Sequence, residues 1–181
     1  ILPADTAWNE GTGIATVPAI AAPARIDEQA VRAAAAALRL GGKDAMLMLT
    51  GIALREDGLM LAGKIAAATG CRILAQWSNV RMARGAGRVP IFRLPYPIDA
   101  ALNTLKDVKH LVLCGARAPI AFFAYPDKPS ILTPEGCDIV TLARLEEDLI
   151  DALERLVDAL DARNAQAKVQ QLDIPPAPTG A

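Results

Sequence analysis

The sequence predicts an α/β fold built on an open parallel sheet that is flanked by helices. Residues 45–49 and 71–77 are short, largely apolar segments that end at small or turn-forming positions, and one helix length separates them. The first segment shows no polar alternation, which is typical of a strand covered on both faces, as in parallel sheets. A third apolar segment, 111–115, follows a proline-rich excursion and a further helix. Strands that alternate with helices in this order indicate a Rossmann-like sheet.

Segments without periodicity flank the predicted domain, which spans residues 26–162. Residues 1–25 carry clusters of glycine and proline, and no periodicity follows Asp5, so we expect an extended linker there. Residues 163–181 are polar and then proline-rich, which predicts a second linker. Linkers at both ends predict that the compact unit is one part of a longer chain.

Hydrophobic periodicity and turn residues predict the other elements of the domain. Two long stretches, 78–97 and 119–129, are irregular and contain several glycines or prolines, as functional loops often do. The predicted elements are a helix capped by Asp27 and ending at Gly41, a helix from Leu54 to Gly70, a helix near residues 98–105, and short strands at 131–132 and 138–142.

The most regular pattern predicts a last helix over residues 145–161. The face of this helix opposite its leucines is acidic. It is either a docking surface or a solvated face, in which the acidic residues of the first turn interact favourably with the helix dipole. The solvated face is the ordinary interpretation of such a pattern. The apolar stripe recurs at spacings of three and four, at Leu145, Leu149, Leu153, Leu156 and Leu160.

The composition argues against nucleic acid and membrane as partners. Nineteen basic and twenty acidic residues give a net charge of −1, without a basic stripe that would neutralise phosphates. The apolar runs fall short of the ~18 residues that a membrane span needs. Cys71, Cys114 and Cys137 show no C-x-x-C spacing and are expected to pack as small hydrophobes, which indicates a reducing, cytoplasmic compartment.

Few residues point to catalysis. His110 is the only histidine, and it precedes an apolar strand, where a structural role is expected. No H-E-x-x-H motif or cysteine cluster indicates zinc. No isolated carboxylate pair stands in an apolar setting that would raise a pKa. We therefore predict no catalytic residue and no metal ligand in this chain.

Nucleotide binding is an alternative that the strand ends leave open. Ligands of open α/β sheets bind beyond the carboxyl ends of the strands, and Gly51 and Gly115 follow two predicted strands. Arg84 and Arg88 add positive charge beside a glycine pair, so these four residues form a candidate site for the ADP moiety of FAD, ADP or coenzyme A. The ordinary alternative is that the glycines make turns and the arginines face water. Without a G-x-G-x-x-G fingerprint, a standalone nicotinamide-dependent oxidoreductase is a weaker alternative.

Short phrases follow one another along the chain: GIALR at 51–55, RGAGR at 84–88, LPY at 94–96, GARAP at 115–119, AFFAYP at 121–126 and PEGC at 134–137. Their order and spacing resemble the central domain of thiamine-diphosphate-dependent enzymes, in particular acetolactate-synthase-like members. Residues 1–5 are similar to the end of a pyrimidine-binding domain. Residues 175–180 are similar to the lead-in to a diphosphate-binding domain.

The resemblance implies a sheet of about six parallel strands in a lyase or transferase that forms homodimers or homotetramers. It implies thiamine diphosphate and Mg²⁺, bound by the pyrimidine- and diphosphate-binding domains, and a 2-keto acid as substrate. The Gly-Asp-Gly…Asn motif that holds magnesium and diphosphate is missing here, since Asp57 and Gly58 follow Glu56. FAD is less expected than in flavin-binding relatives, because Leu94-Pro95 replaces their His-Pro pair.

These observations lead to one main hypothesis and two alternatives. The chain is the central structural domain of an enzyme resembling acetolactate synthase or benzoylformate decarboxylase, and it is not catalytic by itself. The first alternative is a nucleotide-binding module for an ADP-containing ligand. The second is the nicotinamide-dependent oxidoreductase.

Overall fold

The fold is known from a computed structural model that describes residues 3–11, 13–175 and 179. Within these residues lies one sheet in the order β3-β2-β1-β4-β5, in which all neighbouring strands are parallel. The predicted Rossmann-like α/β class is confirmed, with five strands in the described residues in place of about six. The strands are β1 (Ala45–Leu49), β2 (Arg72–Ala75), β3 (Phe92–Arg93), β4 (His110–Cys114) and β5 (Asp138–Ala143).

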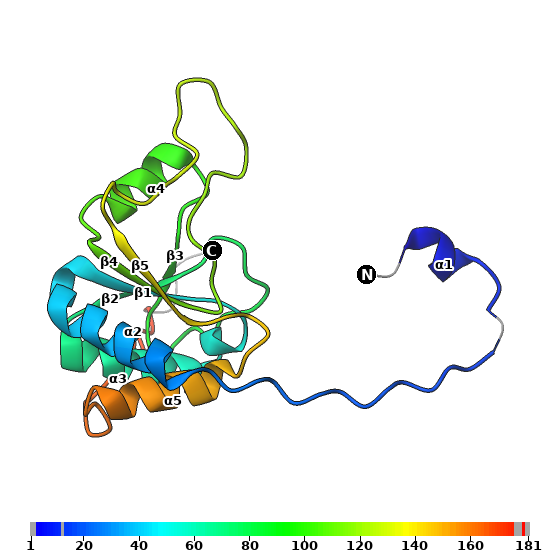
Figure 1. Cartoon of the computed structure of the whole chain (residues 1–181), viewed down its shortest axis with the longest axis horizontal. Helices are drawn as coiled ribbons and strands as arrows, with labels where there is room; N and C mark the ends of the chain where they lie inside the picture. Colours follow the sequence, from blue (N-terminus) through cyan, green and yellow to red (C-terminus); the bar gives the residue numbers. More distant parts are fainter. Residues whose placement is uncertain (1–2, 12, 176–178, 180–181) are drawn as a thin grey trace.

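Helices cover both faces of the sheet, as Figure 1 shows. On one face lie α2 (Glu28–Gly41), α3 (Glu56–Thr69) and α5 (Leu149–Ala159), and on the other lies α4 (Ile98–Leu105). The side chains of β1 alternate between the two cores: Leu47 packs with α2, α3 and α5, whereas Met46 and Met48 pack with α4. All five residues of β1 are buried, as its uninterrupted apolar sequence predicts.

The edge of the sheet beyond β2 differs from the expectation. β3 has only two residues, both exposed, which is too short for a periodic signal and was not predicted. The strand predicted at residues 131–132 is not part of the sheet, because Ile131 makes only an isolated antiparallel bridge with Ile120. A strand as short as β3 depends on pairing with β2 rather than on its own hydrophobicity.

Capping residues decide where the helices begin. Asp27 caps α2 as predicted, since its side chain accepts a hydrogen bond from the Gln29 N–H (3.0 Å). The last helix begins at Leu149, not at residue 145, because the Asp148 side chain accepts hydrogen bonds from the N–H groups of the first turn (3.0 and 3.1 Å). Leu145 therefore lies outside the helix and is 61% exposed.

The predicted helix from Leu54 to Gly70 is divided into two parts. A 3₁₀ turn, η2 (Gly51–Leu54), follows β1 directly, and α3 begins after Arg55. Arg55 has extended backbone angles (φ −82°, ψ 173°), which interrupt the helical path. The end of β1 is thus followed by a tight turn, which later forms one wall of the candidate site.

The acidic residues of α5 are largely engaged by arginines. Asp151 pairs with Arg25 (2.9 Å) and Asp158 pairs with Arg163. Exposed pairs of this kind contribute little to stability, about 0–1 kcal/mol each. They do, however, neutralise the charge that an acidic docking surface would need, so the geometry favours a solvated face.

The two predicted linkers are partly structured. Residues Ala4–Trp8 form a short helix, α1, where extended chain is expected, and the segment runs away from the sheet in Figure 1. The first part of the second linker lies against the domain, because Gln170 exchanges two backbone hydrogen bonds with residues 87 and 88 (both 2.8 Å). Residues 1–2, 12, 176–178 and 180–181 of these predicted linkers lie outside the described residues.

Candidate functional site

Two strand ends meet where the strand order reverses. From β1 the chain proceeds outward through β2 and β3, and then crosses to β4 and β5 on the other side of β1. The reversal between β1 and β4 is the topological switch point, where open α/β sheets bind ligands. There the Thr50 N–H donates to the Cys114 carbonyl (3.3 Å), and Leu49 bridges to Gly115. Gly51 and Gly115, both predicted site residues, lie together at this point.

Both glycines are required by their surroundings. Gly51 and Gly115 have left-handed φ angles of 61° and 69°, which side chains disfavour. A Cβ on Gly115 would lie 2.7 Å from Leu149 Cδ1, and one on Gly51 would lie 3.1 Å from Leu145 Cδ1. The turns are therefore shaped by the close approach of α5 and the segment before it as well as by backbone conformation.

A pocket of about 500 Å³ opens at this point, and we call it the switch-point pocket. Arg55, Arg81 and Arg117 line it, and within the described residues none of the three forms an ion pair. The backbone N–H of Arg117 donates to Gln76 Oε1 (2.9 Å), which holds the start of the loop after β4. Three guanidinium groups beside two strand ends make an environment suited to a phosphate-containing anion.

The two other predicted site residues lie elsewhere. Arg84 lines a neighbouring pocket of about 510 Å³ together with Trp77 and Tyr96. Arg88 pairs with Glu56 (2.9 Å), at the start of α3. The structure therefore brings together the glycines of the predicted site, but not its arginines.

Arg55, Arg81 and Arg117 are not among the predicted site residues, although the sequence contains a positional signal for two of them. Arg55 and Arg117 follow the ends of β1 and β4 by a few residues, so a search outward from each strand end would have found them. Arg81 has no such signal, because it lies in the long irregular segment between β2 and β3. Only folding brings this segment to the end of β1.

The acidic residues at the start of α3 do not form a metal site within the described residues. Glu56 and Asp57 lie in the first turn of α3, and Glu56 is engaged by Arg88. In the part of the chain that the structure describes, no three His, Cys, Asp or Glu side chains are grouped to hold a metal ion. His110 lies at the opposite end of the sheet, with its Nδ1 atom 3.3 Å from Asp138 Oδ2.

Among the described helices, none combines the length and apolar character required to cross a membrane.

Aromatic side chains gather beside the switch-point pocket, although the sequence has only seven of them. Trp77 packs against Phe122 (5.3 Å between ring centroids) and Tyr96 (5.5 Å). Phe122 in turn packs against Phe123, and Phe123 packs against Tyr125. Phe122 is 61% exposed and Phe123 is 52% exposed. This aromatic surface is therefore contiguous and open to solvent, which is typical of a contact region.

The fold and the site define an open α/β domain with a pocket at its switch point, and a solved structure has the same fold. It is that of a provisionally assigned thiamin diphosphate-dependent enzyme from Mycobacterium smegmatis, with a TM-score of 0.56, 20% sequence identity, and coverage of 90% of this chain and 33% of that chain. At this identity the likeness concerns the fold alone.

A curated protein gives the more particular match. The Mycobacterium tuberculosis protein provisionally named acetolactate synthase large subunit IlvX is 43% identical over 181 residues, which cover 99% of this chain and 34% of that protein. The chain spans about a third of the length of this relative. No protein-family model matches the chain. The resemblance to thiamine-diphosphate-dependent, acetolactate-synthase-like enzymes that the sequence predicts is confirmed.

Proposed function

We propose that the chain is the central domain of a cytoplasmic thiamine-diphosphate-dependent enzyme that acts on a 2-keto acid, as a lyase or transferase, and that it is not catalytic by itself. The observation that carries the proposal is the 43% identity along 99% of the chain to one third of the relative named as an acetolactate synthase. Thiamine diphosphate and Mg²⁺ would bind to pyrimidine- and diphosphate-binding domains of the same chain, in a homodimer or homotetramer. The domain's own task is to hold those two domains in register.

The exposed aromatic surface supports this role. Phe122, Phe123 and Tyr125 stand at the rim of the sheet's carboxyl end with about half of their area in contact with solvent. Burial of such side chains contributes about 25 cal/mol per Å² of apolar surface, so a neighbouring domain would gain stability by covering them. The domain therefore has an exposed apolar surface beside the switch point that a neighbouring domain would cover.

A chimera tests the proposal. The matching third of the Mycobacterium tuberculosis relative is replaced by this chain, and thiamine diphosphate binding, oligomeric state and release of CO₂ from pyruvate are compared with the unaltered relative. We expect the chimera to assemble and bind the cofactor like the relative, because its exposed surface would contact the same neighbouring domains.

The isolated 181-residue chain is the matched control, and it is expected to release no CO₂ with thiamine diphosphate and Mg²⁺. Turnover by the isolated chain would contradict a purely structural role. A folded chimera that fails to bind the cofactor, beside a relative that binds it, would contradict the assignment as its central domain.

A second candidate function rests on the switch-point pocket. We infer that its unpaired arginines receive the diphosphate of an ADP-containing ligand such as ADP, FAD or coenzyme A. The observation in its favour is the meeting of Arg55, Arg81 and Arg117 with the backbone turns at Gly51 and Gly115. Neither relative's name mentions such a ligand, so the geometry alone supports this function.

Calorimetry of the 181-residue chain with ADP, FAD and coenzyme A at about 1 mM tests this inference. Arg117→Gln is expected to weaken binding about tenfold, because one charged, multidentate contact to phosphate is lost. Arg84→Gln and Arg88→Gln are the matched controls and should leave the affinity unchanged, since both side chains lie outside the pocket. Absence of heat with all three ligands would exclude the site. A loss of binding confined to Arg84→Gln or Arg88→Gln would show that the ligand binds at the neighbouring loop instead.

A further inference from the structure

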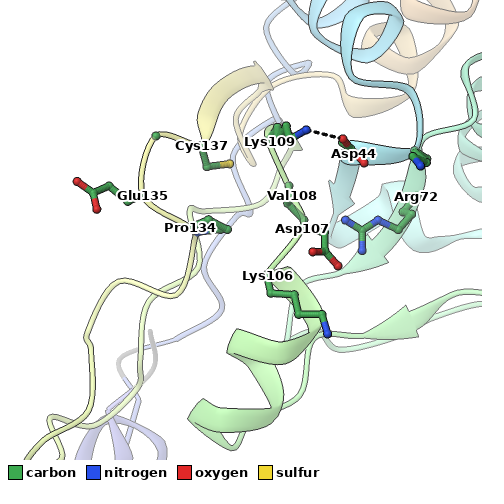
Figure 2. Close-up of a pocket in the computed structure, with 11 residues that line it drawn as sticks. Asp44, Arg72, Lys106, Asp107, Val108, Lys109, Pro134, Glu135 and Cys137 are labelled. Atoms are coloured by element: carbon green, nitrogen blue, oxygen red, sulfur yellow. Dashed lines mark hydrogen bonds and ion pairs between the residues drawn. The ribbon is translucent and has the colours of Figure 1, made fainter.

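A second pocket, of about 650 Å³, lies at the amino ends of the strands, away from the switch point. Figure 2 shows how it is formed by the turn before β1, the start of β2, the segment after α4 and the turn before β5. We call it the amino-end pocket. Neither the proposed function nor either relative's name assigns a role to it.

The pocket carries more positive than negative charge. Lys43, Arg72, Lys106 and Lys109 line it with three carboxylates, and Lys109 is paired with Asp44 (2.8 Å between Nζ and Oδ2). Within the described residues, the other three cations form no ion pair.

The two remaining carboxylates do not cancel this charge. In Figure 2 the Glu135 side chain points away from the pocket, the Arg72 side chain extends toward Asp107, and the Lys106 side chain extends away from Asp107. Three cations thus stand against one inward carboxylate. The pocket as a whole has a cationic lining.

The ordinary explanation of these cations is that they stabilise helix ends. α2, α3 and α4 all finish at this edge, and basic side chains near helix carbonyl ends are favourable. Arg72 does not fit this explanation. Its Nε and Nη2 atoms are buried, and within the described residues neither of them has a hydrogen-bond partner, backbone carbonyls included.

The orphaned atoms form one edge of the guanidinium group. Nε–H and Nη2–H point in the same direction and match the two oxygens of a carboxylate or phosphate. The same edge is used elsewhere in this protein, where Arg25 Nε and Nη2 contact the two carboxylate oxygens of Asp151 (3.4 and 2.9 Å). Buried donors without an acceptor are unfavourable, so an oxyanion at Arg72 would remove that cost.

We propose that the amino-end pocket binds a small oxyanion, a carboxylate or phosphate group of a small molecule, through the Nε–Nη2 edge of Arg72. Because both atoms are buried in the structure, binding requires that the guanidinium rotate about its side-chain torsions to present this edge to the pocket. Lys106 and Lys43 supply further charge from the neighbouring segments. The site is independent of the switch-point pocket, because it lies at the opposite ends of the same strands.

NMR titration of the ¹⁵N-labelled 181-residue chain tests the proposal. Sodium phosphate and sodium succinate are added separately, with sodium chloride adjusted to hold the ionic strength constant. We expect saturable shifts at residues 43–44, 72 and 106–109, with a dissociation constant on the order of millimolar. Saturation with phosphate alone identifies a phosphate site, and saturation with succinate alone identifies a carboxylate site.

Three substitutions make the result specific. Arg72→Gln should raise the dissociation constant about tenfold and Lys106→Gln about threefold, since the first removes the bidentate contact and the second removes only a nearby charge. Arg32→Gln removes the same type of charge from the exposed surface of α2 and should change nothing.

Two results would overturn the proposal. The first is a shift that rises without saturation for both probes. The second is an unchanged dissociation constant in Arg72→Gln. Should Arg72→Gln fail to fold, Lys106→Gln decides alone, and an unchanged dissociation constant there overturns the proposal as well.

Discussion

Leu153→Ala is expected to lower the free energy of unfolding by about 3 kcal/mol and the melting temperature by about 10 °C. Leu153 lies in the middle of α5, is completely buried, and belongs to the core that α5 shares with α2 and α3. Removing its branched end leaves a cavity that three helices and the sheet cannot close together. Urea unfolding followed by circular dichroism measures the change.

The neighbouring residue supplies the control for this prediction. Glu154 is exposed on the same turn of α5, so Glu154→Ala should change the free energy of unfolding by less than about 0.5 kcal/mol. If the two substitutions destabilised the protein equally, the apolar stripe of α5 would not face the core. If Leu153→Ala were neutral, α5 would not contribute to the fold.

Gly58→Ala is expected to lower the free energy of unfolding by about 3 kcal/mol, although it adds only one methyl group. A Cβ at position 58 would lie 2.5 Å from the Ala53 carbonyl oxygen and 2.7 Å from Ala53 Cα. These are backbone atoms of η2 and cannot move aside as a side chain can. The substitution would push η2 away from α3, and η2 is a wall of the switch-point pocket. Urea unfolding and ADP calorimetry of the same variant would detect both effects.

Two other glycines calibrate this prediction. Gly11→Ala should be neutral, because no atom lies within 4 Å of its added Cβ. Gly63→Ala should be intermediate, because its Cβ would meet the side chains of Val89 and Ala167 (both 2.8 Å), of which Val89 can rotate whereas Ala167 can move only with its backbone. Equal stability of the Gly58→Ala and Gly11→Ala variants would show that η2 and α3 are not packed as described.

The sequence by itself determined the fold class, because the signals for that class are local. The unbroken apolar run of β1 predicts a strand buried on both faces, and Asp27 predicts the start of α2 through its own hydrogen-bonding side chain. The order of short motifs likewise predicted the resemblance to thiamine-diphosphate-dependent enzymes, which the 43% identity confirms. The strand and cap signals each lie within a few consecutive residues, and the motif order is read directly along the chain.

Tertiary structure alone decided which residues form the two pockets. β3 exists because β2 pairs with it, and Leu145 is excluded from α5 because the Asp148 N–H bonds to the Ala24 carbonyl (2.9 Å). Arg81 joins Arg55 and Arg117 only when the segment after β2 folds back to the end of β1. The orphaned edge of Arg72 is likewise visible only in the packed structure. Such features depend on contacts between segments distant in sequence, and no local pattern records which distant atoms a side chain will meet.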